Sequence, residues 1–315
     1  MIRALVIGAA GQDGSYLSEQ LAADGAAVFG LSRAGLRTPD KGAVRPLALE
    51  DRAAIGQLIG SGEFNQIYYL AAYHHSAQDL SAARDIVQRS FGIHVNGLIN
   101  IFDAMITAKS KARLFYAASS HVFGVVTREP QDETTPLAPV CAYGISKAAG
   151  VQLCRFYRDN YDLHASAGFL FNHESPRRAL RFLSRKVAHA VAEIKAGERN
   201  DVRLGGLDAR VDWGYCPEYT DAMRRIVALP EGGDFVIASG HAATVRDFVE
   251  AAFARAGLNW RDHVRTDPAI VQKIDRGPLV GDSSKLRRLT GWTARTSLAD
   301  LAALMVDAEL AALYS

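Results

Sequence analysis

The chain has 315 residues, of which 49% are hydrophobic and 22% are charged, and its formal net charge is +2. This composition is typical of a globular protein with one large or two smaller domains, and the weak charge gives no field directed at nucleic acid or an anionic membrane. No apolar run approaches 18 residues and a strand is expected from about residue 2, so we expect neither a transmembrane helix nor a signal peptide.

Short apolar runs alternate with helical patterns over the first half of the chain. Strands are predicted at residues 3–7, 27–31, 66–70, 114–118 and 165–169. Helices are predicted between them, at residues 15–23, 51–59, 91–108 and 142–160. Apolar strands separated by helices favour a parallel sheet covered on both faces, which is a Rossmann-type doubly wound α/β domain over residues 1–170.

The pattern changes after about residue 171. A basic helical stretch at residues 177–195 alternates with short strands at 202–204 and 234–238, and a terminal helix begins at about residue 297. We expect residues 171–315 to form a smaller α/β domain that binds the substrate, with some segments able to return to the first domain.

Three glycines, Gly8, Gly11 and Gly14, follow the first strand and open the first helix. Glycine permits a tight turn and a close approach of the backbone to a ligand, and the start of a helix offers free N–H groups to a pyrophosphate. A plain strand-to-helix turn could use the same glycines, but their place in the first βαβ unit favours a dinucleotide site. We therefore predict that this loop binds the cofactor together with Gln12 and Asp13.

The end of the second strand indicates which dinucleotide is bound. An NAD site usually has an acidic residue there for the ribose hydroxyls, whereas this chain has Ser32 and Arg33. An arginine pairs well with a 2′-phosphate, so NADP is the predicted cofactor and NAD is the alternative. Further cofactor contacts are predicted at Leu49, Leu70, Ala71, Ala72 and Tyr73.

Tyr143 and Lys147 are four residues apart on a predicted helix and so share one face. A nearby ammonium is expected to lower the pKa of the tyrosine, which could then accept a proton from a hydroxyl while hydride leaves the same carbon. Upstream, the strand at 114–118 ends in Ser119 and Ser120, where a doubly wound sheet places its ligands. Ser119 is predicted to bind the substrate oxygen beside the tyrosine.

Two groups of possible metal ligands are predicted not to bind metal. His74 and His75 follow the third strand, where the dinucleotide is expected to pass, and no carboxylate or cysteine at ligand spacing joins them. Cys141, Cys154 and Cys216 fit neither a metal motif nor a disulfide framework. The sparse cysteines favour a reducing compartment, and we expect the cytoplasm.

In these motifs and their order, the chain resembles the extended short-chain dehydrogenase/reductase superfamily, and within it the GDP-mannose 4,6-dehydratase family. Residues 8–17 read GAAGQDGSYL, and residues 170–178 read LFNHESPRR, which is far more specific than a general dinucleotide signature. The likeness continues with the triplet at 184–186, DWG at 212–214, VRDFVE at 245–250, and a Gly-Asp, Lys and Gly-Trp pattern within 281–292. It covers nearly the whole chain.

The resemblance implies an internal redox cycle on a nucleotide-sugar. Hydride leaves C4 for NADP, the 4-ketone acidifies the C5 proton, water is lost across C5 and C6, and the hydride returns to C6. The resemblance also implies that Tyr143 is the base at O4, that Lys147 orients the ribose, and that Ser119 supplies a hydroxyl. The implied substrate-binding residues are Ser120, Asn172, Arg177, Lys186 and Arg210.

The chain departs from the family at several positions. His121 stands where the family has the glutamate that moves the C5 and C6 protons. An imidazole with a pKa of about 6.5 can act as base and then as acid, so His121 is a catalytic candidate, with a structural role as the alternative. Ala48 stands for an aspartate near the adenine, Val211 for the arginine before DWG, and Gln272 for a phosphate-binding arginine, with Lys273 and Arg276 close by.

Three functions therefore remain open. The first is a GDP-mannose 4,6-dehydratase in which His121 replaces the glutamate. The second is a GDP-sugar 4-epimerase or 4-ketoreductase, which needs Ser119, Tyr143 and Lys147 but no base at C5. The third is a non-catalytic NADP-binding partner. The superfamily implies a homodimer through the helices at 91–108 and 142–160. The family's tetramer is the alternative, and the short loop after the second strand weighs against it.

Overall fold

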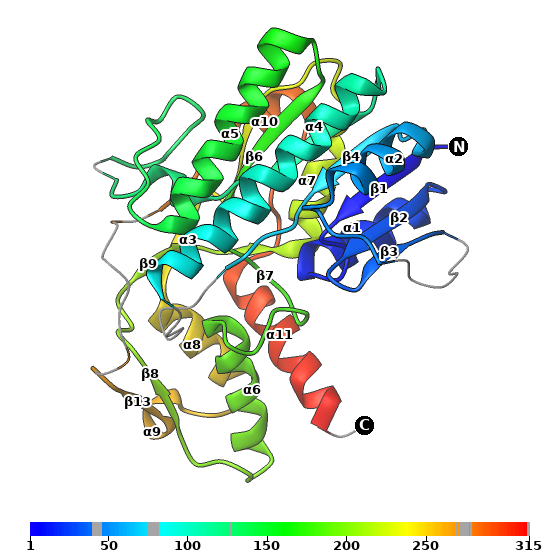
Figure 1. The fold of residues 1–315 in the computed structure, drawn as a ribbon. Helices are drawn as coiled ribbons and strands as arrows, with labels where there is room; N and C mark the ends of the chain where they lie inside the picture. Colours follow the sequence, from blue (N-terminus) through cyan, green and yellow to red (C-terminus); the bar gives the residue numbers. More distant parts are fainter. Residues whose placement is uncertain are drawn as a thin grey trace.

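A seven-stranded sheet lies at the centre of the protein in this computed structural model (Figure 1). The structure describes residues 1–39, 46–74, 82–126, 128–268, 270, 277 and 279–313. Neighbouring strands are parallel except for the last pair, which is antiparallel. In order across the sheet the strands are β11 (Asp234–Ile237), β6 (Ala165–Leu170), β5 (Arg113–Ala117), β4 (Gln66–Tyr69), β1 (Arg3–Ile7), β2 (Ala27–Ser32) and β3 (Gly35–Arg37).

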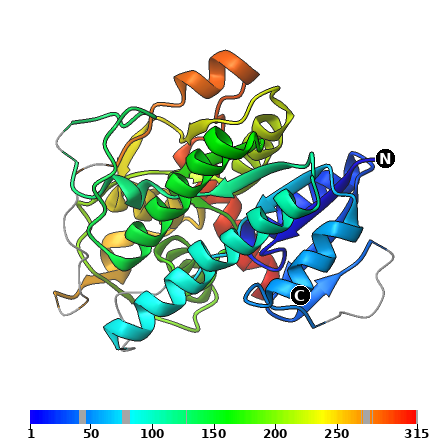
Figure 2. The same ribbon diagram turned by 45° about the horizontal axis from the view of Figure 1, so that its top comes forward.

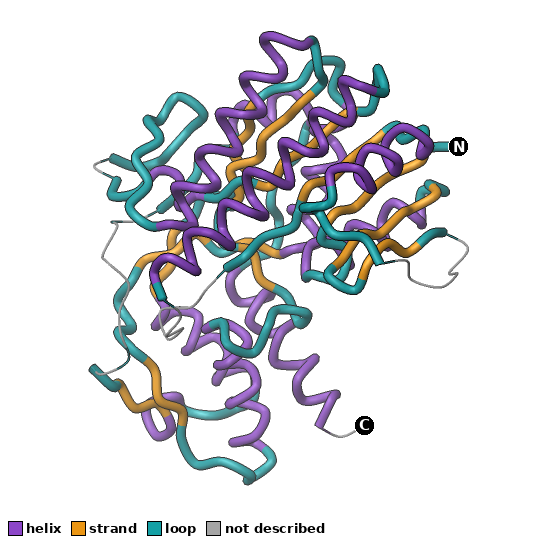
Figure 3. Tube along the Cα trace, viewed as in Figure 1, coloured by secondary structure: helices purple, strands orange, loops and turns teal. Residues whose placement is uncertain are grey.

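Helices cover both faces of this sheet (Figure 3). Successive side chains of a strand point to opposite faces, so Leu5 and Ile7 of β1 enter one core while Ala4 and Val6 enter another. The first core is shared with α2 (Arg52–Gly62), α4 (Gly97–Thr107) and α5 (Ala142–Tyr161), and the second with α1 (Gln12–Ala23), α7 (Cys216–Ala228) and α10 (Ser284–Thr290). The predicted doubly wound α/β fold is confirmed.

The predicted central strands all form within one residue of their expected ends. Every residue of β6 is buried, as is every residue of β1 after Arg3. A strand buried on both faces needs apolar residues at nearly every position, which is why these segments stand out in the sequence.

A second group of elements packs around its own core below the sheet (Figure 1). Its helices are α6 (Leu183–Lys195), α8 (Val245–Arg255), α9 (Trp260–His263) and α11 (Leu298–Leu313). Its strands form three short pairs: β7 (His173–Glu174) with β10 (Gly214–Tyr215), β8 (Val202–Leu204) with β13 (Val264–Thr266), and β9 (Arg210–Asp212) with β12 (Ala242–Thr244).

Segments far along the chain complete the central sheet. The strand expected at 234–238 is β11, which pairs with β6 at the sheet edge, and α7 packs beside α1 on one face. Among the described helices, none combines the length and apolar character needed to cross a bilayer.

The helices expected at 15–23 and 51–59 each extend three residues farther at one end, as α1 and α2, and two other helices differ more from their predicted extents. The helix expected at 91–108 is instead α3 (Ala83–Phe91), a π-helical turn at Gly92–Asn96, and α4. The helix expected from residue 177 begins at Leu183, because Ser175 accepts the backbone N–H of Arg177 and holds the preceding residues in turns. Figure 2 shows α4 and α5 running alongside each other on one side of the molecule.

Candidate active site

The glycine loop between β1 and α1 has the shape of a phosphate cradle. Gly8 has a φ of +97°, and a Cβ added there would lie 2.8 Å from the backbone N of Ala71. A Cβ on Gly14 would lie 2.2 Å from the carbonyl oxygen of Gly8. Gly11 precedes α1 without a side chain to cap the helix, so the first N–H groups of α1 can bind a pyrophosphate. The loop therefore fits a dinucleotide.

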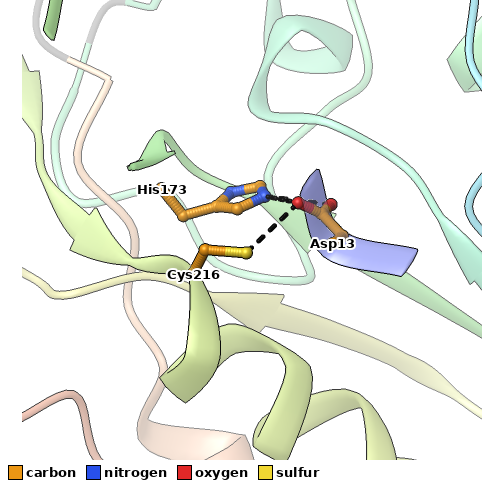
Figure 4. Close-up of side chains that lie close together, drawn as sticks. All are labelled: Asp13, His173 and Cys216. Carbon is orange, nitrogen blue, oxygen red and sulfur yellow. Dashed lines mark hydrogen bonds and ion pairs between the residues drawn. The ribbon is translucent and has the colours of Figure 1, made fainter. Parts of the chain in front are cut away.

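The side chains of Gln12 and Asp13 join this loop to β7. Both carboxylate oxygens of Asp13 lie 3.1 Å from Nε2 of His173. Figure 4 draws the two side chains facing each other. Gln12 donates to the His173 carbonyl oxygen at 3.1 Å and accepts from the Ser175 hydroxyl at 2.9 Å. The cofactor loop and the LFNHESPRR segment are thus held together by side-chain hydrogen bonds.

The attraction between Asp13 and His173 outweighs the effect of burial on their charges. Burial opposes ionisation of both groups, but the histidine charge holds the pKa of Asp13 well below its usual range. Burial lowers the pKa of His173, but the Asp13 carboxylate outweighs this effect and raises it overall. Nδ1 of His173 also contacts the carbonyl oxygen of Phe171 at 2.7 Å, which suits an imidazolium that donates from both nitrogens.

Cys216 completes a three-residue cluster with this pair. Its thiol donates to Asp13 over 3.4 Å, and the possible ligand atoms of the three residues lie within 4.8 Å of one another. The positive charge of Arg178 acts on all three groups and disfavours a cation among them. An ion pair with one S–H···O bond accounts for the arrangement. Sequence reasoning missed it because the residues come from three distant segments.

Ser119, Tyr143 and Lys147 meet at the carboxyl end of β5. Ser119 lies two residues beyond the end of β5, and Tyr143 and Lys147 lie in the first two turns of α5. Lys147 is 1% exposed; its ammonium donates to the Ala117 carbonyl at 2.7 Å and lies 5.9 Å from the centre of the Tyr143 ring. The sheet edge and the helix face expected from the sequence therefore come together.

The pKa of Tyr143 differs from the expected direction. Burial raises it to about 12, although a hydrogen bond from Ser119 and the charge of Arg178 lower it. Burial also lowers the pKa of Lys147 to about 7. The ammonium therefore does not dominate the tyrosine in this state, because desolvation of the two buried groups outweighs their mutual interaction.

Three histidine rings surround Tyr143. The ring centres of His74, His94 and His121 lie 5.0, 5.3 and 5.6 Å from that of Tyr143. The contact with His121 follows from the fold, since a Cβ on Gly144 would lie 2.5 Å from the His121 carbonyl oxygen. The first turn of α5 therefore packs directly on the His121 backbone.

His94, which sequence reasoning missed, is a fixed support for this centre. Its Nε2 accepts the backbone N–H of Tyr73 at 3.0 Å, and its Nδ1 lies 2.7 Å from the Ser146 hydroxyl. Ser146 in turn donates to the Tyr143 carbonyl oxygen. Burial lowers the pKa of His94 to about 2, so the ring stays neutral. In the sequence, His94 lies within a predicted helix, and nothing in the residues around it indicates this role.

The remaining predicted cofactor-binding residues lie in the segment after β4, in the turn after β2 and in the loop before α2. Residues after β4 pass the glycine loop, and the backbone of Ala71 is the atom group nearest Gly8. Arg33 is exposed in the turn between β2 and β3. The carbonyl oxygen of Leu49 accepts from Asn100 of α4. The predicted residues in the segment after β4 are Leu70, Ala71, Ala72 and Tyr73.

The substrate-binding candidates are spread over several elements. Ser120, 3% exposed, begins a short helical turn after β5, and Asn172 is exposed just before β7. Arg177 donates to Ser15 and pairs with Glu19 of α1, Lys186 donates to the Arg203 carbonyl oxygen, and Arg210 pairs with Glu129. Gln272, Lys273, Arg276 and His75 lie outside the described residues.

Arg178, rather than Arg177, is the arginine whose charge acts on Tyr143. Its guanidinium stacks 3.9 Å from the centre of the Phe182 ring, which in turn lies 5.3 Å from His74. The resemblance implied Arg177 as a substrate-binding residue, but the sequence could not indicate which arginine of the basic run lies beside Tyr143.

Comparison with known proteins assigns the family. The chain is 32% identical to GDP-mannose 4,6 dehydratase 1 of Arabidopsis thaliana, over 98% of this chain and 89% of that protein. It is 31% identical to GDP-mannose 4,6 dehydratase of Homo sapiens, over 98% of this chain and 91% of that protein.

Solved structures share the fold. RMD from Pseudomonas aeruginosa, complexed with NADPH, has a TM-score of 0.86 at 20% identity and covers 99% of this chain and 100% of that chain. UDP-glucose 4-epimerase from Thermotoga maritima, with UDP-glucose, has a TM-score of 0.82 at 19% identity and the same coverage of both chains. A family model described as GDP-mannose 4,6 dehydratase matches residues 5–305, and the chain belongs to that family.

Proposed function

We propose that this protein is an NADP-dependent 4,6-dehydratase of a GDP-linked hexose, GDP-mannose being the first candidate. The observation that carries the proposal is the grouping of Ser119, Tyr143, Lys147 and His121 beside a glycine loop that fits a dinucleotide. Family membership supports the reaction class, and the relatives at 31–32% identity are named for GDP-mannose.

The first step oxidises the sugar at C4. Gly8, Gly11 and Gly14 would hold the pyrophosphate of NADP, which supplies a hydride acceptor when bound. Tyr143 removes the O4 proton, Ser119 donates a hydrogen bond to the same oxygen, and Lys147 binds beside the ribose. The resulting ketone at C4 makes the C5 proton acidic.

The second step removes water. His121 accepts the C5 proton, the C5–H electron pair forms the C5=C6 bond, and the C6–O bond breaks as the hydroxyl leaves as water with one further proton, which balances the proton that Tyr143 took from O4. Hydride addition at C6 and return of the proton from His121 to C5 complete a 4-keto-6-deoxy sugar. An imidazole side chain can both accept a proton and return it, as these two transfers require.

A 4-epimerase or 4-ketoreductase is the second candidate. It is favoured by one observation: the ring that packs against Tyr143 from position 121 is a histidine, where the family has the glutamate that moves the C5 and C6 protons. Ser119, Tyr143 and Lys147 are sufficient for chemistry at C4 alone. A non-catalytic NADP-binding partner is disfavoured because mere binding has no need of a buried Tyr–Lys pair.

Mass spectrometry of GDP-mannose incubated with the protein, with and without added NADP, tests the function. A product lighter by one water is expected, and Tyr143→Phe should abolish it. An isomer of unchanged mass, or reduced cofactor without water loss, would instead establish the epimerase or reductase. No change in sugar or cofactor would contradict both enzymatic readings for this substrate.

The choice of NADP over NAD rests on Arg33. Arg33→Ala should raise the dissociation constant of NADPH by about 10- to 100-fold, the value of one charge-assisted phosphate contact, while that of NADH stays unchanged. Fluorescence titration of the reduced cofactors measures both constants. Arg37→Ala on neighbouring β3 is the matched control. Equal weakening of both cofactors would show that Arg33 does not bind the 2′-phosphate.

We also propose a cytoplasmic homodimer that forms through α4 and α5. The three cysteines form no disulfide, which agrees with a reducing compartment. Phe156 and Tyr161 of α5 are each 48% exposed, as expected of a helix face that a second copy would cover. Sedimentation should give a dimer that Phe156→Glu dissociates and that Leu289→Glu on α10 leaves intact.

A further inference from the structure

His74 is a titratable group beside the catalytic tyrosine that the steps above do not use. It follows β4 at the carboxyl edge of the sheet, and its ring centre lies 5.0 Å from Tyr143 and 6.3 Å from His121. On its other side it lies 5.3 Å from Phe182, which precedes α6. The imidazole therefore stands between the catalytic tyrosine and the smaller group of elements.

The proton count of the dehydration leaves one transfer without a donor. Tyr143 gains the proton from O4, and His121 keeps the proton from C5 until it returns it to that carbon. The oxygen on C6 needs a further proton to depart as water rather than as hydroxide. A general acid close to both Tyr143 and the C6 oxygen would close the cycle.

We propose that His74 is this acid, a second catalytic imidazole that works opposite His121. The proposal rests on the dehydratase function. As His121 takes the C5 proton and the C5=C6 bond forms, protonated His74 gives its proton to the departing O6, and water leaves. The proton that Tyr143 removed from O4 then passes to His74, so that each turnover restores both histidines and consumes no proton.

The packing of the three rings suits this division of work. His74 and His121 both contact the Tyr143 ring edge-on, at interplanar angles of 67° and 87°, and they contact each other at 60°. Two imidazoles held this close share protons readily, because one positive charge disfavours a second nearby. The geometry therefore allows one ring to act as the base while the other acts as the acid.

Single-turnover kinetics of His74→Asn separate the steps. C4 oxidation, followed by the absorbance of reduced nicotinamide, should stay within about twofold of wild type, whereas water loss should slow by about 100-fold or more. His241→Asn, an exposed histidine before β12, is the matched control and should change neither rate. Retained C4 oxidation also shows that the variant is folded.

A substrate with fluorine in place of the C6 hydroxyl gives the decisive comparison. Fluoride leaves without a proton, so His74→Asn should eliminate it at nearly the wild-type rate, whereas His121→Asn, which lacks the base, should not. Water loss by His74→Asn at the wild-type rate would overturn the proposal, as would a failure of fluoride to rescue it. Absence of water loss in the wild type would overturn the dehydratase function itself. The wild-type protein is therefore measured before any variant.

Discussion

Lys147 is held in its position at a cost to the folded state. Its side chain is 1% exposed, and apart from the Ala117 carbonyl its ammonium faces the rings of Tyr116 and Tyr143, at 5.0 and 5.9 Å. No carboxylate within the described residues lies at ion-pair distance from it, and the charge of Asp13 offsets only part of the effect of its burial. A buried cation without a counter-ion is costly, and such costs collect at functional sites.

Lys147→Met should therefore stabilise the protein without cofactor while abolishing turnover. The pKa of Lys147 is about 7 in the folded state and about 10.5 in an unfolded chain. The cost of burying the lysine charge is present in full below about pH 7 and is absent above about pH 10.5. The free energy of unfolding of the wild type therefore rises with pH across that range. Urea unfolding at pH 7 should show a gain of about 1–3 kcal/mol for the variant.

The matching measurement at pH 10 gives the control. There the gain should shrink towards zero, because the lysine is neutral in the folded state and partly neutral in the unfolded one. A variant that is less stable than wild type at pH 7 would mean that the hydrogen bond to Ala117 outweighs the buried charge.

At the residue scale, the sequence predicts those site residues that have a local signature. Helical spacing placed Tyr143 and Lys147 on one face, and the end of an apolar strand placed Ser119 beside them. His94 and Arg178 had no such signature, because their contacts with Tyr143 cross from other elements. The pKa of Tyr143 was expected in the wrong direction, since desolvation depends on burial that spacing alone does not reveal.

At the element scale, the junction of β1 and α1 depends on missing side chains. Gly14→Ala would place a methyl group 2.2 Å from the Gly8 carbonyl oxygen and 2.7 Å from the Cα of Ala9, both backbone atoms. The helix must move away from the loop, at an expected cost of about 2 kcal/mol and with loss of dinucleotide binding. Thermal unfolding and cofactor titration measure the two effects.

Gly56→Ala is the control from another helix. No atom lies within 4 Å of a Cβ added at Gly56 in α2, so the change should stabilise the protein by about 0.5–1 kcal/mol through helix propensity and chain entropy. If both variants behaved alike, close approach of the backbone at Gly14 would not be the reason for its glycine.

The contact between α1 and β7 should make stability depend on pH. The raised pKa of His173 stabilises the protein fully below about pH 6.5 and loses its effect as pH rises through that raised value. The lowered pKa of Asp13 stabilises it above about pH 4 and loses its effect only at lower pH. The ion pair therefore contributes most between these two limits.

Asp13→Asn should lower the free energy of unfolding by about 2 kcal/mol at pH 5.5, and by less at pH 9. Urea unfolding at both values measures the difference. Asp307→Asn, which removes an exposed pair with Arg255 at 2.8 Å, should leave the free energy of unfolding nearly unchanged at either pH, because water screens the two charges. A loss from Asp13→Asn that does not vary with pH would assign its effect to shape rather than charge.

At the scale of the whole molecule, residues 1–170 do not contain a complete sheet. Strand β11 and helices α7 and α10 all come from later in the chain, and they bury Val6, Tyr68 and Phe115. A fragment of residues 1–170 should therefore lack a cooperative thermal transition, which the full chain should show. Near-ultraviolet circular dichroism measures this, and a fragment that melts cooperatively would contradict it.

Sequence reasoning predicted the central strands most accurately, and it did not predict how segments far apart in the chain pair with each other. The strands near the middle of the sheet were predicted within one residue, because burial on both faces leaves a continuous apolar signal. The pairing of β11 with β6 was not predicted, since a short strand says nothing of its neighbour. Helices α7 and α8 were also missed, as was the π-helical turn before α4.

The late arrival of β11 has a consequence for biosynthesis. Until residue 237 has emerged from the ribosome, β6 is an exposed parallel edge whose six residues are all apolar or small. At the usual rate of translation this lasts several seconds, long compared with the collapse of the earlier strands. The nascent chain therefore passes through an interval in which it can pair with other chains, and chaperone capture during that interval would favour the correct product.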